Sequence, residues 1–324
     1  MKVLLTDASG MLGSCLAERL LESGFSVRAL LDPADDAPSL NGLPVERAPG
    51  RMLDPESVQA ALEGAQAVFH CASAGRYWPL HPNALRAGNV EGTRNLLVSM
   101  SRAGIDKLVH LGSAFSFGAG TLEEPGTEET PYDGERFGLG CLDSTRTAQE
   151  LALRYGESGK LRCVVINPTL VIGAGAGPAE PLTALLRYAS SGHKVFPPGG
   201  VNAVAVTDVA VAALKALGRG RPGHCYIVGG ENVSYRELLA KLAAALGVPP
   251  PSRAAGARGL LARGLAGSIR GRLTGAVPAM TGGLARLAAA TLYYSGEKAA
   301  GQLEYSPGPL GPAIESACRG FKSR

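Results

Sequence analysis

The chain has 324 residues, of which 45% are hydrophobic and 19% charged, a composition typical of a globular protein with a sizeable core and not of a disordered one. Its formal net charge of +4 is too small to indicate nucleic-acid binding. No apolar run approaches the length of a membrane span, so we expect no integral membrane segment.

The cysteines bear on the compartment and on metal binding. Six of them are scattered along the chain with no close pair at metal-ligand spacing, and several lie in apolar runs. This pattern favours reduced core cysteines in a cytoplasmic protein, without a metal. The first residues lead directly into an apolar run, which does not resemble a signal peptide.

Residues 1–32 carry the pattern around which the rest of the chain is organised. Apolar runs at 2–6 and 26–31 predict two buried parallel strands, with a helix between them. Gly10 and Gly13 open that helix, where backbone N–H groups and the helix dipole can hold a diphosphate. Asp7 stands where the first glycine of this pattern is expected, and a carboxylate there either turns outward or repels a diphosphate.

Strand and helix patterns then alternate along the chain. Further strands are expected at 43–47, 67–70, 107–112 and 161–167, and helices at 54–62, 82–102 and around 149–155. This alternation predicts an α/β fold, a doubly wound parallel-sheet Rossmann domain over residues 1–173. Ligands of such sheets bind beyond the carboxyl ends of the strands, so side chains at these ends should converge on one cleft.

From about residue 174 the pattern changes. Glycine and proline cluster, and the expected elements become shorter and mixed, with strands at 201–206 and 225–228 and helices at 207–217 and 234–246. This predicts a smaller C-terminal α+β substrate lobe over 174–324, from which some elements return to the Rossmann domain.

Residues 253–291 are rich in alanine and glycine and contain six arginines and no acidic residue. Such a segment could touch a membrane surface or an anionic substrate. A helical projection places Leu261, Leu265, Ile269 and Leu273 in one stripe, but Arg258 and Arg272 project near it. The projection favours a solvated or lobe-packing helix pair over an interfacial helix.

Five motifs point to one known family. They are the Gly10/Gly13 turn, NVEGT at 89–93, GSAFSFG at 112–118, NPTLVIG at 167–173 and YIVGGENVSYRELL at 226–239. Together they resemble the extended short-chain dehydrogenase/reductases, the NAD-dependent epimerase/dehydratase family. Within it the chain is most similar to the hopanoid-associated sugar epimerase and dihydroflavonol-reductase-like branch. The resemblance extends over nearly the whole chain and weakens after about residue 250.

The resemblance implies that the catalytic motif is degenerate. In the family a Ser or Thr holds the substrate oxygen, a Tyr exchanges a proton with it, and a Lys four residues on lowers the pKa of that Tyr. Ser113 matches the serine, but Cys141 and Thr145 stand at the tyrosine and lysine positions. Cys141 could act as an acid if a cation lowered its pKa, yet an inert replacement is favoured. Tyr132, with Arg136 four residues on, is another candidate acid, although we expect a packing residue in a loop.

The resemblance also implies a set of cofactor positions. They fall on Thr6, Asp7, Gly10, Met11, Leu12, Gly13, Asp32, Cys71, Ala72, Asn89, Pro168 and Thr169. Reductases of this branch typically have an arginine at position 32 for the 2′-phosphate of NADP, so Asp32 favours NAD(H) over NADP(H) if a dinucleotide is bound. Arg51 stands where the family has an aspartate near the adenine. All these residues can also serve the fold alone.

The substrate side and the assembly are less defined by sequence. Arg76, Tyr77 and Trp78 follow the fourth strand in a loop that usually lines the substrate pocket of the family, where they could cover an apolar or ring-shaped ligand or simply anchor the loop. A homodimer through the helices at 82–102 and 143–157 would be common for the family.

Three function classes follow. The first is a diverged NAD(P)-binding protein that acts on a small organic or sugar-like substrate by a non-redox step. The second is a working oxidoreductase or epimerase with a replacement acid, and the third is a non-catalytic ligand sensor or scaffold. The departures at Asp7, Arg51, Cys141 and Thr145 favour the first and third classes over standard hydride chemistry.

Overall fold

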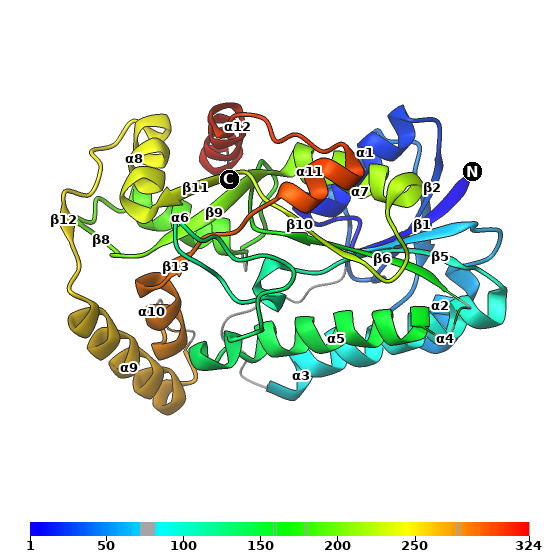
Figure 1. Ribbon diagram of the computed structural model, residues 1–324, viewed down its shortest axis with the longest axis horizontal. Coiled ribbons are helices and arrows are strands. Elements are labelled where there is room, and N and C mark those ends of the chain that lie inside the picture. Colours follow the sequence, from blue (N-terminus) through cyan, green and yellow to red (C-terminus); the bar gives the residue numbers. More distant parts are fainter. Residues whose placement is uncertain are drawn as a thin grey trace.

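The computed structural model describes residues 1–71, 82–157, 159, 161–178, 180–276, 278 and 280–323. Its main sheet (Figure 1) is formed by β1 (Lys2–Thr6), β2 (Ser26–Leu31), β3 (Glu46–Pro49), β4 (Ala67–His70), β5 (Lys107–Leu111), β6 (Arg162–Pro168) and β10 (Cys225–Val228). These seven strands are parallel, in the order β10-β6-β5-β4-β1-β2-β3. The order reverses at β1, which places a ligand cleft at the carboxyl ends of the central strands.

Helices cover both faces of this sheet (Figure 1). On one face lie α2 (Pro55–Ala61), α3 (Pro82–Arg86), α4 (Gly92–Ala103) and α5 (Gly140–Glu157), and on the other lie α1 (Met11–Glu22), α7 (Val206–Arg219) and α11 (Glu297–Leu303). A separate hydrophobic core forms on each face. The central strands are therefore buried on both sides, which is why they consist of nearly uninterrupted apolar runs.

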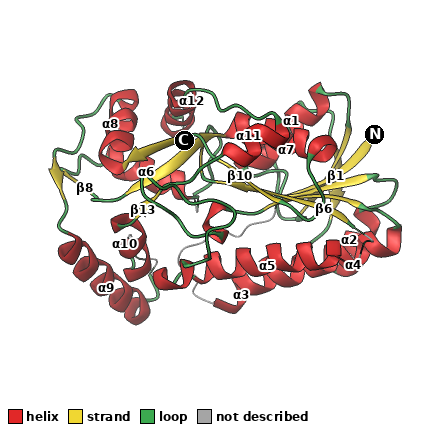
Figure 2. Cartoon of the chain, viewed as in Figure 1, coloured by secondary structure: helices red, strands yellow, loops and turns green. Residues whose placement is uncertain are grey.

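The remaining elements form a smaller lobe beside the carboxyl ends of the main strands (Figure 2). Its strands are β7 (Leu170–Ile172), β8 (Val195–Phe196), β9 (Gly200–Ala205), β11 (Glu231–Ser234), β12 (Arg253–Ala254) and β13 (Thr291–Leu292). Its helices are α6 (Pro181–Ser190), α8 (Tyr235–Leu246), α9 (Ala257–Thr274), α10 (Gly282–Ala289) and α12 (Leu310–Lys322). Strand β9 pairs with β7, β11 and β13, and β8 pairs with β12. The predicted fold class, a Rossmann sheet with a smaller α+β lobe, is confirmed.

Two expected elements differ in detail. The strand expected at 43–47 lies at Glu46–Pro49, because it is an exposed edge strand without a buried apolar run to mark it. The helix expected at 82–102 is interrupted by a π-helical segment at Ala87–Glu91 between α3 and α4. Such a segment inserts an extra residue into the turn and often marks a functional position.

A chain of buried polar groups crosses the sheet at His70. The Thr6 hydroxyl accepts from the Cys71 N–H (3.2 Å) and lies 2.8 Å from His70 Nδ1. On the other side, His70 Nε2 lies 2.9 Å from Thr93 Oγ1, whose proton goes to the Asn89 carbonyl. His70 therefore donates from Nε2 and accepts at Nδ1, which requires the neutral ring. Burial keeps its pKa well below the usual value, and the neighbouring His110 lowers it further.

His110 lies on β5 directly opposite His70, with ring centroids 5.3 Å apart. Its Nδ1 has no hydrogen-bond partner among the described residues, and burial lowers its pKa to about 4. We expect acidification from the ordinary pKa of 6.5 to about 4 to remove roughly 3 kcal/mol of unfolding free energy through this side chain, because only the unfolded state takes up the proton in that range.

Urea unfolding at a series of pH values measures this effect. His110→Gln should flatten the loss of stability on acidification, whereas the matched substitution of the exposed His193 should not. If the unfolding free energy of wild type and His110→Gln falls equally with pH, His110 is not the side chain responsible for the loss of stability.

Candidate active site

One cavity of about 1220 Å³ lies at the carboxyl ends of the central strands, between the main sheet and the lobe. Ten of the residues singled out from the sequence line it, namely Asp7, Gly10, Met11, Leu12, Cys71, Ser113, Cys141, Thr145, Pro168 and Thr169. Thr6, Gly13, Asp32 and Asn89 do not line it. Ala72, Arg76, Tyr77 and Trp78 lie outside the described residues. The catalytic-position residues and part of the cofactor-position residues therefore line the same cavity.

The turn after β1 has the backbone shape that normally requires glycine. Asp7 has a φ of 52°, in the left-handed region where a side chain costs free energy. Its carbonyl accepts from the Gly10 N–H (3.2 Å). A Cβ at Gly13 would lie 2.0 Å from the same carbonyl oxygen, so only glycine fits there. The two glycines thus serve the tight packing of α1 on this turn, even though Asp7 replaces the first glycine.

Asp7 lines the open cavity and its side chain is exposed there, but many protein atoms lie close to its carboxyl. Burial raises its pKa to about 7, and the nearby carboxylates of Glu180 and Asp35 contribute to the rise. At neutral pH a substantial fraction of Asp7 is therefore uncharged. The repulsion expected between this residue and a diphosphate is absent in the protonated form.

The N-terminus of α1 opens into the same part of the cavity. Gly10 is the N-cap, no side chain caps the helix, and its first turn has no acidic residue. Unpaired N–H groups and the positive end of the helix dipole at this place suit an anionic diphosphate. The residues present therefore fit a dinucleotide, on the condition that Asp7 carries a proton.

Ser113 is held in place by its backbone. The side chain of Asn167, at the end of β6, donates to the Ser113 carbonyl (2.9 Å) and to Gln149 on α5 (2.5 Å). The Ser113 hydroxyl accepts from the Phe115 N–H (3.3 Å), which leaves its own proton for an acceptor in the cavity. This arrangement can donate one hydrogen bond to a substrate oxygen.

Cys141 and Thr145 lie one helical turn apart on α5 and both line the cavity. Burial raises the pKa of the Cys141 thiol to about 11, so it remains protonated at neutral pH. The Thr145 hydroxyl has no hydrogen bond to another described residue. Among the described residues that line the cavity there is no lysine. This part of the wall thus offers a neutral thiol and a hydroxyl.

Asn89 lies behind the cavity wall and does not line the cavity itself. It is buried, and its side-chain amide donates to the Ser144 hydroxyl (2.9 Å), which in turn donates to the Cys141 carbonyl (3.1 Å). Asn89 therefore connects the buried His70 chain to the first turn of α5. Its position behind the cavity wall makes it a residue that fixes where Cys141 lies.

Tyr132 is not on the cavity wall. Its hydroxyl donates to Asp143 in a short hydrogen bond, and the Arg146 guanidinium lies 4.9 Å from its ring centroid. Burial, with the contact to Asp143, raises its pKa, which is the opposite of what an acid with an activating cation requires. Arg136 pairs with Asp133. These contacts argue against the hypothesis that Tyr132 and Arg136 replace the missing acid.

Asp32 and Arg51 form an exposed ion pair outside the cavity. Arg51 Nε lies 2.9 Å and Nη2 3.3 Å from the two carboxylate oxygens. The hydrogen bond from Arg51 lowers the pKa of Asp32, which stays ionised. Asp32 and Arg51, which both differ from the family pattern, thus neutralise each other. The sequence did not indicate this pairing because the two residues are 19 positions apart.

The lobe contributes residues that the motifs did not reveal. Arg263 and Arg270 on α9, Tyr188 on α6 and Glu180 before α6 all line the cavity. The arginines lie at the lobe end of the cavity, on α9, whereas Asp7 lies at the end formed by the main sheet. The only signal in the sequence was the absence of acidic residues over 253–291.

A doubly wound sheet with a glycine turn that opens into a cavity at its strand ends defines a dinucleotide-binding class of protein. A model of the NAD dependent epimerase/dehydratase family matches residues 3–229, and the chain belongs to this family. The resemblance inferred from the motifs is confirmed.

Individual relatives agree. A putative dihydroflavonol 4-reductase of Synechocystis sp. is 31% identical over 251 residues, which are 76% of this chain and 73% of that protein. Sterol demethylase protein B of Methylococcus capsulatus is 31% identical over 253 residues, 78% of this chain and 76% of that protein. The crystal structure of gox2253 has a TM-score of 0.85 and 31% identity, and the match covers 99% of this chain and 98% of that chain.

The described residues lack two further features. They contain no group of three or more His, Cys, Asp or Glu side chains arranged to hold a metal ion. None of the helices within the same ranges has the length and apolar character needed to cross a membrane.

Proposed function

We propose that this protein binds NAD(H) and a small apolar organic substrate in the cavity and acts on that substrate by a non-redox step. The observation that carries the proposal is the wall at Cys141 and Thr145, where a thiol with a pKa of about 11 and a hydroxyl replace an acid and its cation. A cavity of this volume at the strand ends supports continued ligand binding.

The lining supports an apolar substrate over a sugar. Most of the lobe side is leucine, valine, proline and alanine, which offer a sugar no hydrogen-bond partners. Arg263 and Arg270 supply positive charge for one anionic group. The two curated relatives are named for a dihydroflavonol and for a sterol, which agrees with this lining.

Each part of the cavity has its own role in this proposal. The N–H groups at Met11 and Leu12 would hold the diphosphate, and Asp7 in its protonated form would not repel it. The Ser113 hydroxyl donates to a substrate oxygen and fixes its orientation, with Asn167 holding the Ser113 backbone. Bound NAD(H) supplies the capacity for hydride exchange, for which this wall offers no matched proton donor.

A comparison of wild type with Cys141→Tyr/Thr145→Lys tests the proposal. Calorimetry should show that both bind NADH, whereas only the double variant should change nicotinamide absorbance with a panel of carbonyl compounds. Adding Ser113→Ala to the double variant should abolish that change. A substrate-dependent change in nicotinamide absorbance with wild type would favour the oxidoreductase alternative, and absence of NADH and NADPH binding would favour the sensor or scaffold.

A further inference from the structure

Helix α9 exposes a line of large apolar side chains. Leu265, Ile269 and Leu273 are 54%, 59% and 82% exposed, and their spacing of four residues places them along one side of the helix. The other large apolar side chains with high exposure in the described chain, such as Leu53 and Leu122, lie singly in other regions. We call Leu265, Ile269 and Leu273 the α9 stripe.

The packing of α9 holds the stripe outward. The opposite side of the helix packs on α10, where a Cβ at Gly264 would come within 2.6 Å of both Ala285 Cβ and the Thr281 carbonyl oxygen. The side next to it, with Leu260 and Thr274, forms a wall of the cavity. Gly264 allows the close approach to α10, and in this packing the stripe faces outward. The expected helix pair therefore exists. Of the stripe, Leu265 touches the start of α10, where a Cβ at Gly282 would lie 3.3 Å from Leu265 Cδ2, and it remains 54% exposed.

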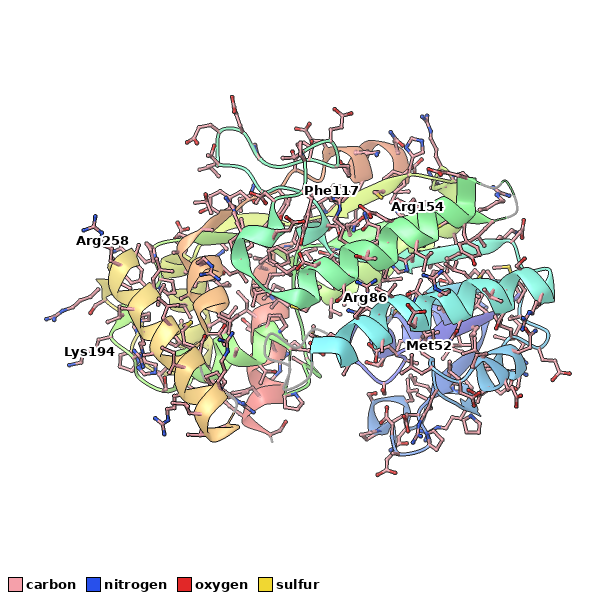
Figure 3. All side chains as sticks on the ribbon, turned by 90° about the horizontal axis from the view of Figure 1, so that it is seen from below. Met52, Arg86, Phe117, Arg154, Lys194 and Arg258 are labelled. Carbon is pink, nitrogen blue, oxygen red and sulfur yellow. The ribbon has the colours of Figure 1, made fainter. Side chains whose placement is uncertain are left out.

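Positive charge surrounds the stripe. At 100° per residue, Arg258 projects between Leu265 and Ile269, and Arg272 projects beside Leu265. In the helical projection these two positions count against an interfacial helix. Their long side chains can, however, keep the guanidinium groups at headgroup level while the neighbouring apolar side chains enter the bilayer. Both arginines are exposed, and neither is in an ion pair within the described ranges. Figure 3 shows Arg258 and Lys194 projecting outward from the same end of the lobe. No acidic residue occurs over 253–291 to neutralise this surface.

Exposed apolar side chains among unpaired arginines match the interface of an anionic lipid bilayer, where apolar groups enter below the headgroups and cations remain among the phosphates. We propose that the outward side of α9 docks on an anionic phospholipid membrane. The cavity lies directly behind this helix, so docking would bring its apolar lobe end next to the bilayer. The proposal concerns a peripheral surface and does not depend on the proposed catalytic role.

Vesicle co-sedimentation tests the proposal with the full chain. We expect binding to phosphatidylcholine vesicles that contain about one third phosphatidylglycerol, weaker binding at high salt, and little binding to phosphatidylcholine alone. Ile269→Ser/Leu273→Ser should lower the affinity at least about tenfold. Arg258→Gln/Arg272→Gln should lower it about fivefold per charge removed.

The matched control is Leu53→Ser/Leu122→Ser, which removes two exposed leucines in other regions (53% and 61% exposed) and should bind like wild type. Circular dichroism confirms that each variant is folded. Failure of wild type to bind the anionic vesicles, or equal binding by the stripe variant, overturns the proposal. A wild-type dimer in light scattering that dissociates in the stripe variant would instead assign the stripe to a second copy of the chain.

Discussion

Replacing Asp7 by glycine is expected to tighten NADH binding at least about tenfold at about pH 8 and to remove most of its pH dependence. With a pKa of about 7, Asp7 is mostly ionised at that pH, and the ionised form repels the diphosphate. Binding by wild type therefore requires a proton on Asp7. Its affinity should fall up to about tenfold for each unit of pH above 7.

The direction of this pH dependence follows from the two protonation states of Asp7. A bound diphosphate favours neutral Asp7, so it raises the pKa of this group above the value of about 7 in the free protein. Between the two values the complex binds more protons than the free protein, and higher pH weakens binding. The glycine variant has no such proton to take up. Calorimetric titration with NADH at several pH values measures both profiles.

Two controls locate the effect. Asp36→Asn removes one exposed negative charge from the same region without touching the cavity, and should leave NADH affinity nearly unchanged. Glu180→Gln should move the midpoint of the pH profile to lower pH, because Glu180 contributes to the raised pKa of Asp7. If Asp7→Gly binds NADH with the affinity and pH profile of wild type, the diphosphate does not lie at this turn.

The main sheet could be predicted from sequence because its signals are local. Each central strand is buried on both faces, so it stands out as an apolar run, and the glycine turn after β1 is read from neighbouring residues. The exposed edge strand β3 lacked such a run and was misplaced by three residues at its start. The sequence therefore predicted the buried strands more accurately than the exposed one.

Only those residues of the site that belong to a family motif could be predicted from the sequence. Ser113, Cys141 and Thr145 share a wall because they follow the family's register on β5 and α5. Asn89 lies behind that wall because a π-helical segment and Ser144, 55 residues away, determine where its side chain points. Arg263 and Arg270 enter the cavity through the packing of α9 on α10, a contact for which the sequence carries no motif.

The Asp32–Arg51 pair leads to the last prediction, a change of cofactor preference. Wild type should bind NADH more tightly than NADPH, because ionised Asp32 both repels a 2′-phosphate and occupies Arg51. Asp32→Ala removes the carboxylate and releases the guanidinium, which can then pair with the 2′-phosphate. We expect NADPH affinity to rise roughly tenfold or more and NADH affinity to fall, as measured by calorimetry.

Two controls distinguish recognition of the 2′-phosphate by Arg51 from a general effect of breaking a surface ion pair. Both partners are exposed, so the melting temperature should hardly change. Glu46→Ala is the matched control, since it removes the exposed carboxylate that pairs with Arg28 and Lys2 on the same edge of the sheet. Adding Arg51→Ala to Asp32→Ala should cancel the gain in NADPH affinity. A gain that persists without Arg51, or a wild type that already prefers NADPH, would show that the pair does not read the 2′ position of the ribose.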